Sequence, residues 1–425
     1  MTTQVVLMNG LGIALASDSA VTAGGKVLNS SEKIFPLPAP HKAALLTSGN
    51  AEFMGIPWEV IFSAWSEGLD RPLGSMPEYR ESLQKFLQST VSNIGDLSKA
   101  EGSYLLRSYW GEDNVYAKIE QIYMNVVSPH MEKVLTGDDF SLYLTNDWSE
   151  DTTAKMSERI TPEIVEEFRV QVENAAEERR QKYQITPVGI SEAQALIWVQ
   201  TYWKQIQRDP QEDFKSWPII PGLGDLIMHL HSVFIFHPDF SDSNINIVGY
   251  GVSDLFPSAA GTFIHGCIRG TVIKRWDGHS DSWEGTRSFF FGQDDAISAI
   301  FKGDDWLLNS TAAEATQQTL RQIYSQLESS NDEDVQLAKE YVKQSLESDD
   351  IRDKMLSEGR SKRRDPFYKA IGMSPILDLA EFAAQLVGVQ AAFAAMTQEN
   401  PSVGGTVDVA TISHRNGFEW IRHKH

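Results

Sequence analysis

Strand-type and helix-type segments occupy separate blocks of this chain, and their order constrains the fold more than any single motif. Two apolar strands joined by an Asn-Gly turn open the chain at residues 3–8 and 12–18, which is a strong hairpin signal. Helical spacing of apolar residues follows to about residue 95, strands return at 244–292, and a buried helix at 375–396 precedes a last hairpin. Segregated runs of this kind predict a layered α+β fold rather than alternating βαβ units.

Two mainly helical stretches interrupt this pattern, so we divide the chain into a core in three parts and two insertions. The first insertion contains a helix that opens with Thr161-Pro162, an N-cap residue followed by proline in the first turn. The predicted core parts are residues 1–99, 241–302 and 373–425, and the predicted insertions are residues 100–240 and 303–372.

Composition and charge exclude several classes of protein. The 425 residues carry a formal net charge of −21, so phosphates would be repelled and we expect no nucleic-acid partner. We read no apolar run as long enough to span a membrane and no charged-then-apolar leader, which predicts a soluble cytoplasmic chain without a membrane partner. The single cysteine, Cys267, lies in a β-rich run and is predicted to be a buried small hydrophobe rather than a nucleophile.

The opening residues, Met-Thr-Thr, indicate a chemistry that only a chain terminus offers. If Met1 is removed, the hydroxyl of Thr2 can act as the nucleophile while its own α-amine acts as general base. A free α-amine has an ordinary pKa of about 8, so it can accept a proton close to neutral pH. A neighbouring cation would favour the neutral amine, a carboxylate would orient that cation, and backbone N–H groups would stabilise an oxyanion. The candidates for these three tasks are Lys33, Asp18 and Gly49.

Taken together, these segments resemble the proteasome β-subunit family and its bacterial relative HslV, which are N-terminal nucleophile (Ntn) hydrolases. The resemblance covers about half of the chain and lies in Thr2-Thr3, the hairpin NGLGIALASDS, SSEKIF around Lys33, LLTSGNAEF around Gly49, and the closing segment NPSVGGTVDVATISHRNGFEWI. It implies a four-layer αββα sandwich with Thr2 as nucleophile. It further implies that Lys33 tunes the threonine amine, that Asp18 holds Lys33, and that Gly49 contributes to the oxyanion hole.

Two positions depart from the family's pattern, and four others match its substrate contacts. Where the family carries a serine near the threonine amine this chain has Gln293, and where it carries an aspartate before the last Gly-Gly this chain has Asn400. Both amides can hydrogen-bond a water or an amine, so we keep them as candidate catalytic residues. The resemblance implies that Thr22 pairs with the substrate backbone. It also gives the substrate pocket uncharged walls of small residues, at Val21, Thr47 and Ala51.

The resemblance leads to one main functional hypothesis and two alternatives. The main hypothesis is a proteasome-like threonine hydrolase that cleaves amide bonds of a peptide or protein through an acyl-threonine intermediate, without a cofactor or metal. Family members form rings, so we expect a homo-oligomer, and an unfoldase or regulator would be a compatible partner. The alternatives are an amide-bond transferase or ligase that uses the same threonine, and a non-catalytic oligomeric scaffold. His229 and His231 are not interpreted as a metal site, because no third ligand follows at a recognisable spacing.

Overall fold

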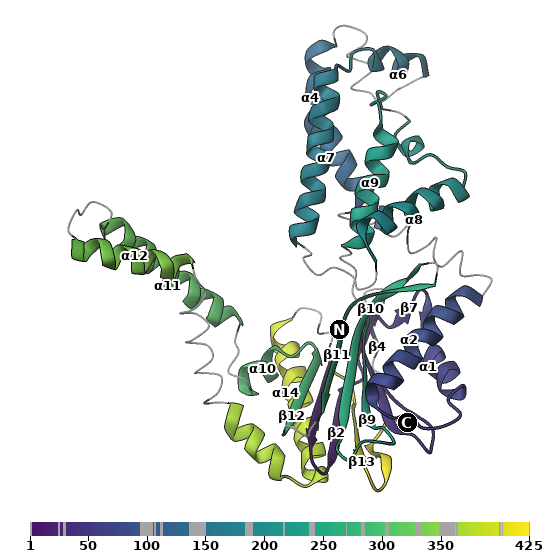
Figure 1. Cartoon of the computed structure of the whole chain (residues 1–425), viewed down its shortest axis with the longest axis vertical. Helices are drawn as coiled ribbons and strands as arrows, with labels where there is room; N and C mark the ends of the chain where they lie inside the picture. The colour runs from purple at the N-terminus through teal and green to yellow at the C-terminus, as the bar shows by residue number, and fades with distance from the viewer. Residues whose placement is uncertain are drawn as a thin grey trace.

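The computed structural model (Figure 1) has helices and antiparallel sheets in separate blocks of the chain, which confirms the α+β class. The structure describes residues 2–23, 26–28, 31–93, 105, 108–110, 114–135, 150–182, 190–215, 217–237, 243–268, 270–281, 285–301, 306–327, 333–347, 362, 364–398, 401 and 403–424.

The first five-stranded sheet contains the N-terminal hairpin at its centre. Its strand order is β12-β1-β2-β13-β14, and every neighbouring pair is antiparallel. The predicted opening hairpin is confirmed, because Asn9 pairs with Gly12 and Met8 with Ile13 across the turn. The strands are Thr3–Asn9 (β1), Gly12–Asp18 (β2), Arg287–Gly292 (β12), Val407–Ser413 (β13) and Gly417–Arg422 (β14).

The second five-stranded sheet has the order β11-β10-β9-β6-β5 and is also antiparallel throughout. Its strands are Ile34–Pro36 (β5), Lys42–Gly49 (β6), Ser243–Tyr250 (β9), Ser258–Ile268 (β10) and Thr271–Asp281 (β11). Two short pairs accompany it, β3 (Val21–Ala23) with β4 (Lys26–Leu28) and β7 (Glu52–Phe53) with β8 (Ile56–Pro57). Asp18, Lys33 and Gly49 therefore all lie at the ends of strands, or next to them.

Apolar side chains from both sheets form one core between them. Successive side chains of a strand point to opposite faces, so Val6 and Met8 of β1 enter this core while Val5 and Leu7 point to the other face. The second sheet contributes Ile34, Ala44, Leu46 and Val248. Full burial of a side chain of this size contributes roughly 1.5–3 kcal/mol, so the contact holds the two sheets together strongly.

Helices cover the outer face of each sheet (Figure 1). On the first sheet, α14 (Ile376–Thr397) and α10 (Asp295–Phe301) pack against the outward side chains of β1 and β2. On the second sheet, α1 (Trp58–Glu67) and α2 (Met76–Asn93) do the same, and buried Cys267 lies in that layer as predicted. The resulting order of layers is helices, sheet, sheet, helices.

Helix α14 is unusually apolar. Among the described residues it alone is long and apolar enough to cross a membrane by length and composition, with a mean hydropathy of 1.4, so the expectation that no run reaches this length is wrong by that measure. The helix packs through Leu379, Ala383 and Val387 against the first sheet, and 44% of the apolar window is buried. This packing accounts for the apolar face toward the sheet, whereas Leu377, Phe393 and Met396 are apolar side chains that remain exposed.

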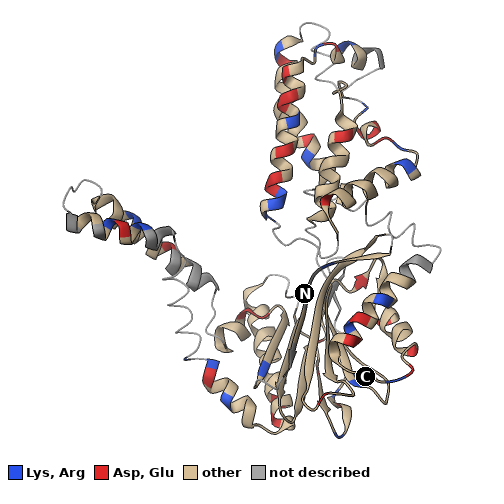
Figure 2. Ribbon diagram, in the orientation of Figure 1, with Lys and Arg blue, Asp and Glu red and all other residues tan. Residues whose placement is uncertain are grey.

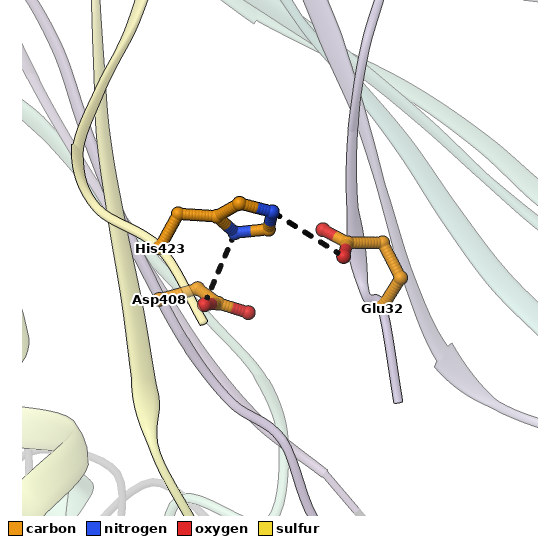
Figure 3. Close-up of side chains that lie close together, drawn as sticks. All are labelled: Glu32, Asp408 and His423. Carbon is orange, nitrogen blue, oxygen red and sulfur yellow. Dashed lines mark hydrogen bonds and ion pairs between the residues drawn. The ribbon is translucent and has the colours of Figure 1, made fainter. Parts of the chain in front are cut away.

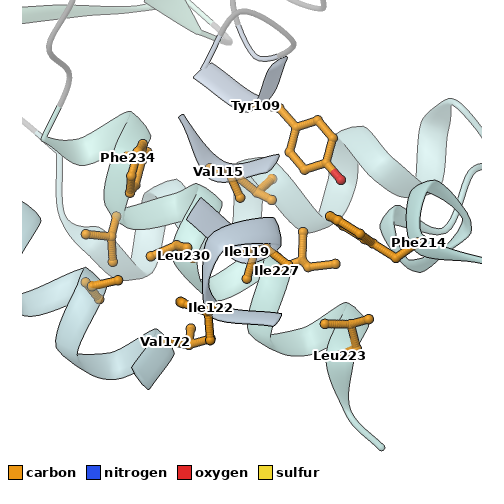
Figure 4. Close-up of a cluster of buried hydrophobic side chains, with 14 of the residues drawn as sticks. Tyr109, Val115, Ile119, Ile122, Val172, Phe214, Leu223, Ile227, Leu230 and Phe234 are labelled. Atoms are coloured by element: carbon orange, nitrogen blue, oxygen red, sulfur yellow. The ribbon is translucent and has the colours of Figure 1, made fainter. Parts of the chain in front are cut away.

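The described helices between residues 105 and 237, called here the helical unit, build a hydrophobic core of their own (Figure 4). They are α4 (Val115–Val134), α6 (Glu150–Ser157), α7 (Pro162–Lys182), α8 (Glu192–Gln205), the 3-10 helix η1 (Pro210–Phe214) and α9 (Leu223–Phe236). Ile268 and Ile273 of the β10–β11 hairpin join this core and connect it to the sheets. Figure 2 marks acidic and basic residues along these helices and few on the strands.

Helices α11 (Trp306–Leu327) and α12 (Glu333–Glu347) pack on each other and project from the sheets in Figure 1. Both lie within the predicted insertion at 303–372, of which residues 303–305, 328–332, 348–361 and 363 are outside the described ones.

Candidate active site

Asp18 and Lys33 form a fully buried ion pair at the end of β2. Lys33 Nζ donates to Asp18 Oδ1 at 2.8 Å and to the carbonyl oxygen of Ala20 at 2.6 Å. The backbone N–H of Thr3 donates to the same Asp18 oxygen at 2.9 Å, and the N–H of Gly404 donates to Oδ2 at 3.1 Å. The carboxylate thus fixes the lysine, the first strand and a segment from the far end of the chain.

Burial changes the pKa of Lys33. Removal from water lowers the pKa of the Lys33 ammonium, and the negative charge of Asp18 and its hydrogen bond oppose that shift. The side chains are only 4% and 0% exposed, so neither charge is solvated, and each depends on the other. The pair therefore supplies a fixed cation with a single orientation.

Thr2 lies directly before β1 and is held there through its backbone. Its carbonyl oxygen accepts from the N–H of Gln293 at 2.7 Å, and Thr3 Oγ1 donates to the Gln293 carbonyl oxygen at the same distance. Gly292 has φ 80°, and a Cβ atom there would lie 1.9 Å from the Thr2 carbonyl oxygen. Only glycine permits this close approach of the two strands.

The turn after β6 is fixed from two sides. Gly49 has φ 85°, a left-handed conformation that favours glycine. The N–H of Trp58 donates to the Ala51 carbonyl oxygen at 3.1 Å, and its indole N–H donates to Ser243 Oγ at 2.9 Å. Ser243 Oγ in turn donates to the Asn50 carbonyl oxygen at 3.1 Å. These contacts hold the turn in one conformation at the start of α1.

A cavity of about 350 Å³ joins these elements. Its lining contains five of the residues predicted from the sequence, which are Thr2, Lys33, Thr47, Gly49 and Ala51. Asp18 lies behind Lys33, because it is the buried partner of that side chain. Residues that are far apart in the sequence are thus brought together around one cavity.

The remaining predicted residues are placed less fully. Val21 and Thr22 lie on β3, paired with Leu28 and Val27, and their side chains are outside the described part of the structure. Gln293 contacts Thr2 and Thr3 through its backbone, while its side-chain amide lies 3.5 Å from Asp295 Oδ2. Asn400 falls outside the described residues.

Two charged residues of the cavity were not singled out by the sequence. Glu32 and Glu59 both belong to its lining, so the expectation of uncharged walls is wrong. Glu32 directly precedes Lys33, and Glu59 lies in the first turn of α1. A glutamate at either position is ordinary on a protein surface, and only the fold reveals that both face one cavity.

Glu32 also belongs to a group with Asp408 and His423 that could hold a metal ion (Figure 3). The ligand atoms of these three residues lie within 4.8 Å of one another. Both oxygens of Asp408 already have partners, however. Oδ1 accepts from the Lys424 N–H at 2.9 Å and contacts His423 Nδ1 at 3.3 Å, while Oδ2 accepts from Lys424 Nζ at 2.5 Å. The lysine ammonium thus provides the cation that this carboxylate requires, and we assign no metal here.

The two histidines considered from the sequence lie in different surroundings. His231 is buried in the helical unit, whereas His229 Nε2 lies 3.4 Å from Glu173 Oε1 at a half-exposed position. The indole N–H of Trp203 donates to His231 Nδ1 at 3.3 Å, which assigns the ring proton to Nε2, facing Ser108 Oγ at 2.8 Å. Burial lowers the pKa of His231 to about 4. A neutral ring with this tautomer cannot take a proton from Ser108, so the pair is structural.

Comparisons with known proteins give no family assignment. No family model matches the chain, and a search of curated proteins finds no relative.

Proposed function

We propose that this protein is a proteasome-like N-terminal threonine hydrolase that cleaves amide bonds in a peptide or protein. The observation that carries the proposal is the buried Asp18–Lys33 pair behind a cavity that Thr2, Lys33 and Gly49 line together. Maintaining two buried charges is expensive unless they pair, and such pairs beside an opening are typical of functional sites.

The proposed fold is the four-layer αββα sandwich of Ntn hydrolases. The order of helices, sheet, sheet and helices supports this assignment, as does the position of Thr2 at the start of a central strand of the first sheet. The helical unit and the α11–α12 pair are then insertions into that sandwich.

In the proposed reaction, Thr2 must be the first residue of the active chain, because only then does it carry an α-amine. Thr2 Oγ attacks the substrate carbonyl carbon, and its proton passes to that amine. The Lys33 cation favours the neutral, basic amine, and the Gly49 N–H donates to the oxyanion. The carbon–nitrogen bond then breaks, and the amine group returns the proton to the leaving nitrogen. Water hydrolyses the resulting ester, which releases the acid and restores the hydroxyl.

A peptide or protein substrate and a homo-oligomeric assembly rest on the family resemblance, whereas a cytoplasmic location rests on the composition of the chain. Transfer of the acyl group to an amine instead of water would use the same threonine. Mass spectrometry of products formed with a competing amine distinguishes the two reactions, since transfer adds that amine to the acyl fragment.

The first prediction tests the nucleophile directly. Incubation with a peptide epoxyketone, which needs a hydroxyl and an adjacent amine, should add one inhibitor mass at Thr2. Thr2→Ala should remove the adduct and all amide cleavage, whereas Thr2→Ser should retain both. Intact mass and peptide mapping provide the measurement. Turnover by Thr2→Ala at the wild-type rate, or an active chain that retains a residue before Thr2, would exclude this mechanism and leave the scaffold alternative.

A further inference from the structure

The cavity that Thr2 lines has an unbalanced charge. Its lining contains three ionisable side chains, Glu32, Lys33 and Glu59. The ammonium of Lys33 is engaged by Asp18 and the Ala20 carbonyl, so its charge is compensated outside the cavity. The two glutamates therefore determine the sign of the potential that a ligand meets.

Within the residues that the structure describes, Glu32 has only a long ion pair for its negative charge, which it makes with His423. Its Oε1 atom is buried without a hydrogen-bond partner within the described part of the chain, and its Oε2 atom lies 3.9 Å from His423 Nε2, beyond hydrogen-bond distance (Figure 3). The nearby ammonium of Lys424 is directed to Asp408 and the Ser31 carbonyl oxygen. Burial raises the pKa of Glu32, the positive charges of Lys424 and His423 oppose that shift, and the negative charges of Asp408 and Glu59 add to it, so Glu32 and Glu59 repel each other. A cation between them would relieve both effects.

The other walls suit a long side chain with a cationic end. Phe35 and Pro57 provide apolar surface in the same lining, against which a methylene chain can pack while its charged group reaches a carboxylate. The net charge of −21 also attracts cations toward the molecule as a whole.

We propose that the cavity selects substrates with a cationic group, bound between Glu32 and Glu59 next to Thr2. The group is a primary ammonium or guanidinium, supplied either by a lysine or arginine side chain on the acyl side of the cleaved bond or by the α-ammonium of a short peptide. This inference rests on the proposed hydrolase function.

The experiment measures how fast epoxyketones label Thr2. The probes are N-acetyl-lysyl, N-acetyl-norleucyl and N-acetyl-glutamyl epoxyketones, together with norleucyl epoxyketone that has a free α-amine. Because a carboxylate of the cavity would hydrogen-bond the cationic group, the cationic probes should label Thr2 about ten times faster than the N-acetyl-norleucyl probe. The glutamyl probe should react slowest. Preference for the lysyl probe identifies a side chain as the ligand, and preference for the free amine identifies the α-ammonium.

Glu32→Gln and Glu59→Gln should each reduce that preference, with the larger loss at the more buried Glu32. Glu52→Gln is the matched control, because Glu52 is exposed on β7, close to the turn, but does not line the cavity. Equal labelling by lysyl and norleucyl probes, or the same ratio in Glu32→Gln and Glu52→Gln, would overturn the inference while the nucleophile stands. If no probe labels Thr2, the proposed function fails and the inference fails with it.

Discussion

The sheets and the helical unit each bury an ionisable side chain, but they treat its charge differently. Between the sheets and their cavity, Lys33 keeps a charged partner in Asp18. In the helical unit, His231 is surrounded by Trp203, Ser108 and other uncharged groups, and its pKa falls to about 4. The comparison teaches that a buried ionisable group can be kept neutral by its surroundings or kept charged by a partner, and the proposed function rests on the second arrangement.

The largest predicted effect breaks the charged pair. Asp18→Ala leaves the Lys33 ammonium buried without its partner and should lower the free energy of unfolding by about 3–5 kcal/mol. The double variant Asp18→Ala, Lys33→Met removes both charges and should recover much of that loss. Neither variant should label at Thr2. Urea unfolding followed by circular dichroism provides the measurement. A loss below about 1 kcal/mol in the single variant would show that the pair is solvated.

A second prediction concerns how tightly the strand before the pair is held. Gly292→Ala would place a Cβ atom 1.9 Å from the Thr2 carbonyl oxygen, whereas Gly55→Ala, at a nearly identical φ of 83°, meets no atom within 4 Å. Both variants carry the backbone strain of alanine at positive φ, so their difference isolates the close approach. We expect Gly292→Ala to cost about 1–3 kcal/mol more and to abolish labelling of Thr2. Equal unfolding midpoints and equal labelling would contradict the described contact.

The smallest effect tests the neutral histidine in the helical unit. Above pH 6.5 His231 is neutral in both the folded and unfolded states. As the pH falls below 6.5, His231 becomes protonated in the unfolded state. In the folded state its pKa is about 4, so it stays neutral and the free energy of unfolding falls. At pH 5 this loss is at most about 2 kcal/mol.

Urea midpoints at pH 7 and pH 5 check this expectation. His231→Phe should be less stable at both pH values but should lose less between them than the wild type does. His130→Phe is the control, because His130 lies on α4 of the same unit near its surface and contacts the Arg159 carbonyl oxygen. An unchanged pH dependence in His231→Phe would show that other groups determine it.

Local sequence patterns predicted much of the fold. The Asn-Gly turn predicted the β1–β2 hairpin, and the apolar run at residues 375–396 predicted the helix α14, which is buried on the face toward the first sheet but exposed on the other. Strands β10 and β11 turn back at Gly270, which has φ 72°. Apolar residues continue on both sides of that turn, so periodicity alone gave no signal of the reversal.

The part of the candidate site that lies in short, recognisable segments could be predicted from the sequence. The positions of Asp18, Lys33 and Gly49 came from a resemblance in short segments, and the structure gathers them around one cavity. The ion pair between Glu32 and His423 could not be predicted, because it joins the first and last parts of the chain. The spacing of residues in the sequence does not predict which of two adjacent side chains, Glu32 or Lys33, contacts Asp18 and which contacts His423.

The hydrogen bond from the Gly404 N–H to Asp18 joins residues separated by 386 positions. Ser19 and Ala20 also donate to the Gly404 carbonyl oxygen, so the end of β2 is completed by a segment that the ribosome makes late. A nascent chain that has not reached residue 404 lacks one donor to the carboxylate that orients Lys33. Contacts this distant in sequence also form slowly, because a long loop must close first. The end of β2 therefore reaches its assembled environment only after residue 404 has been synthesised.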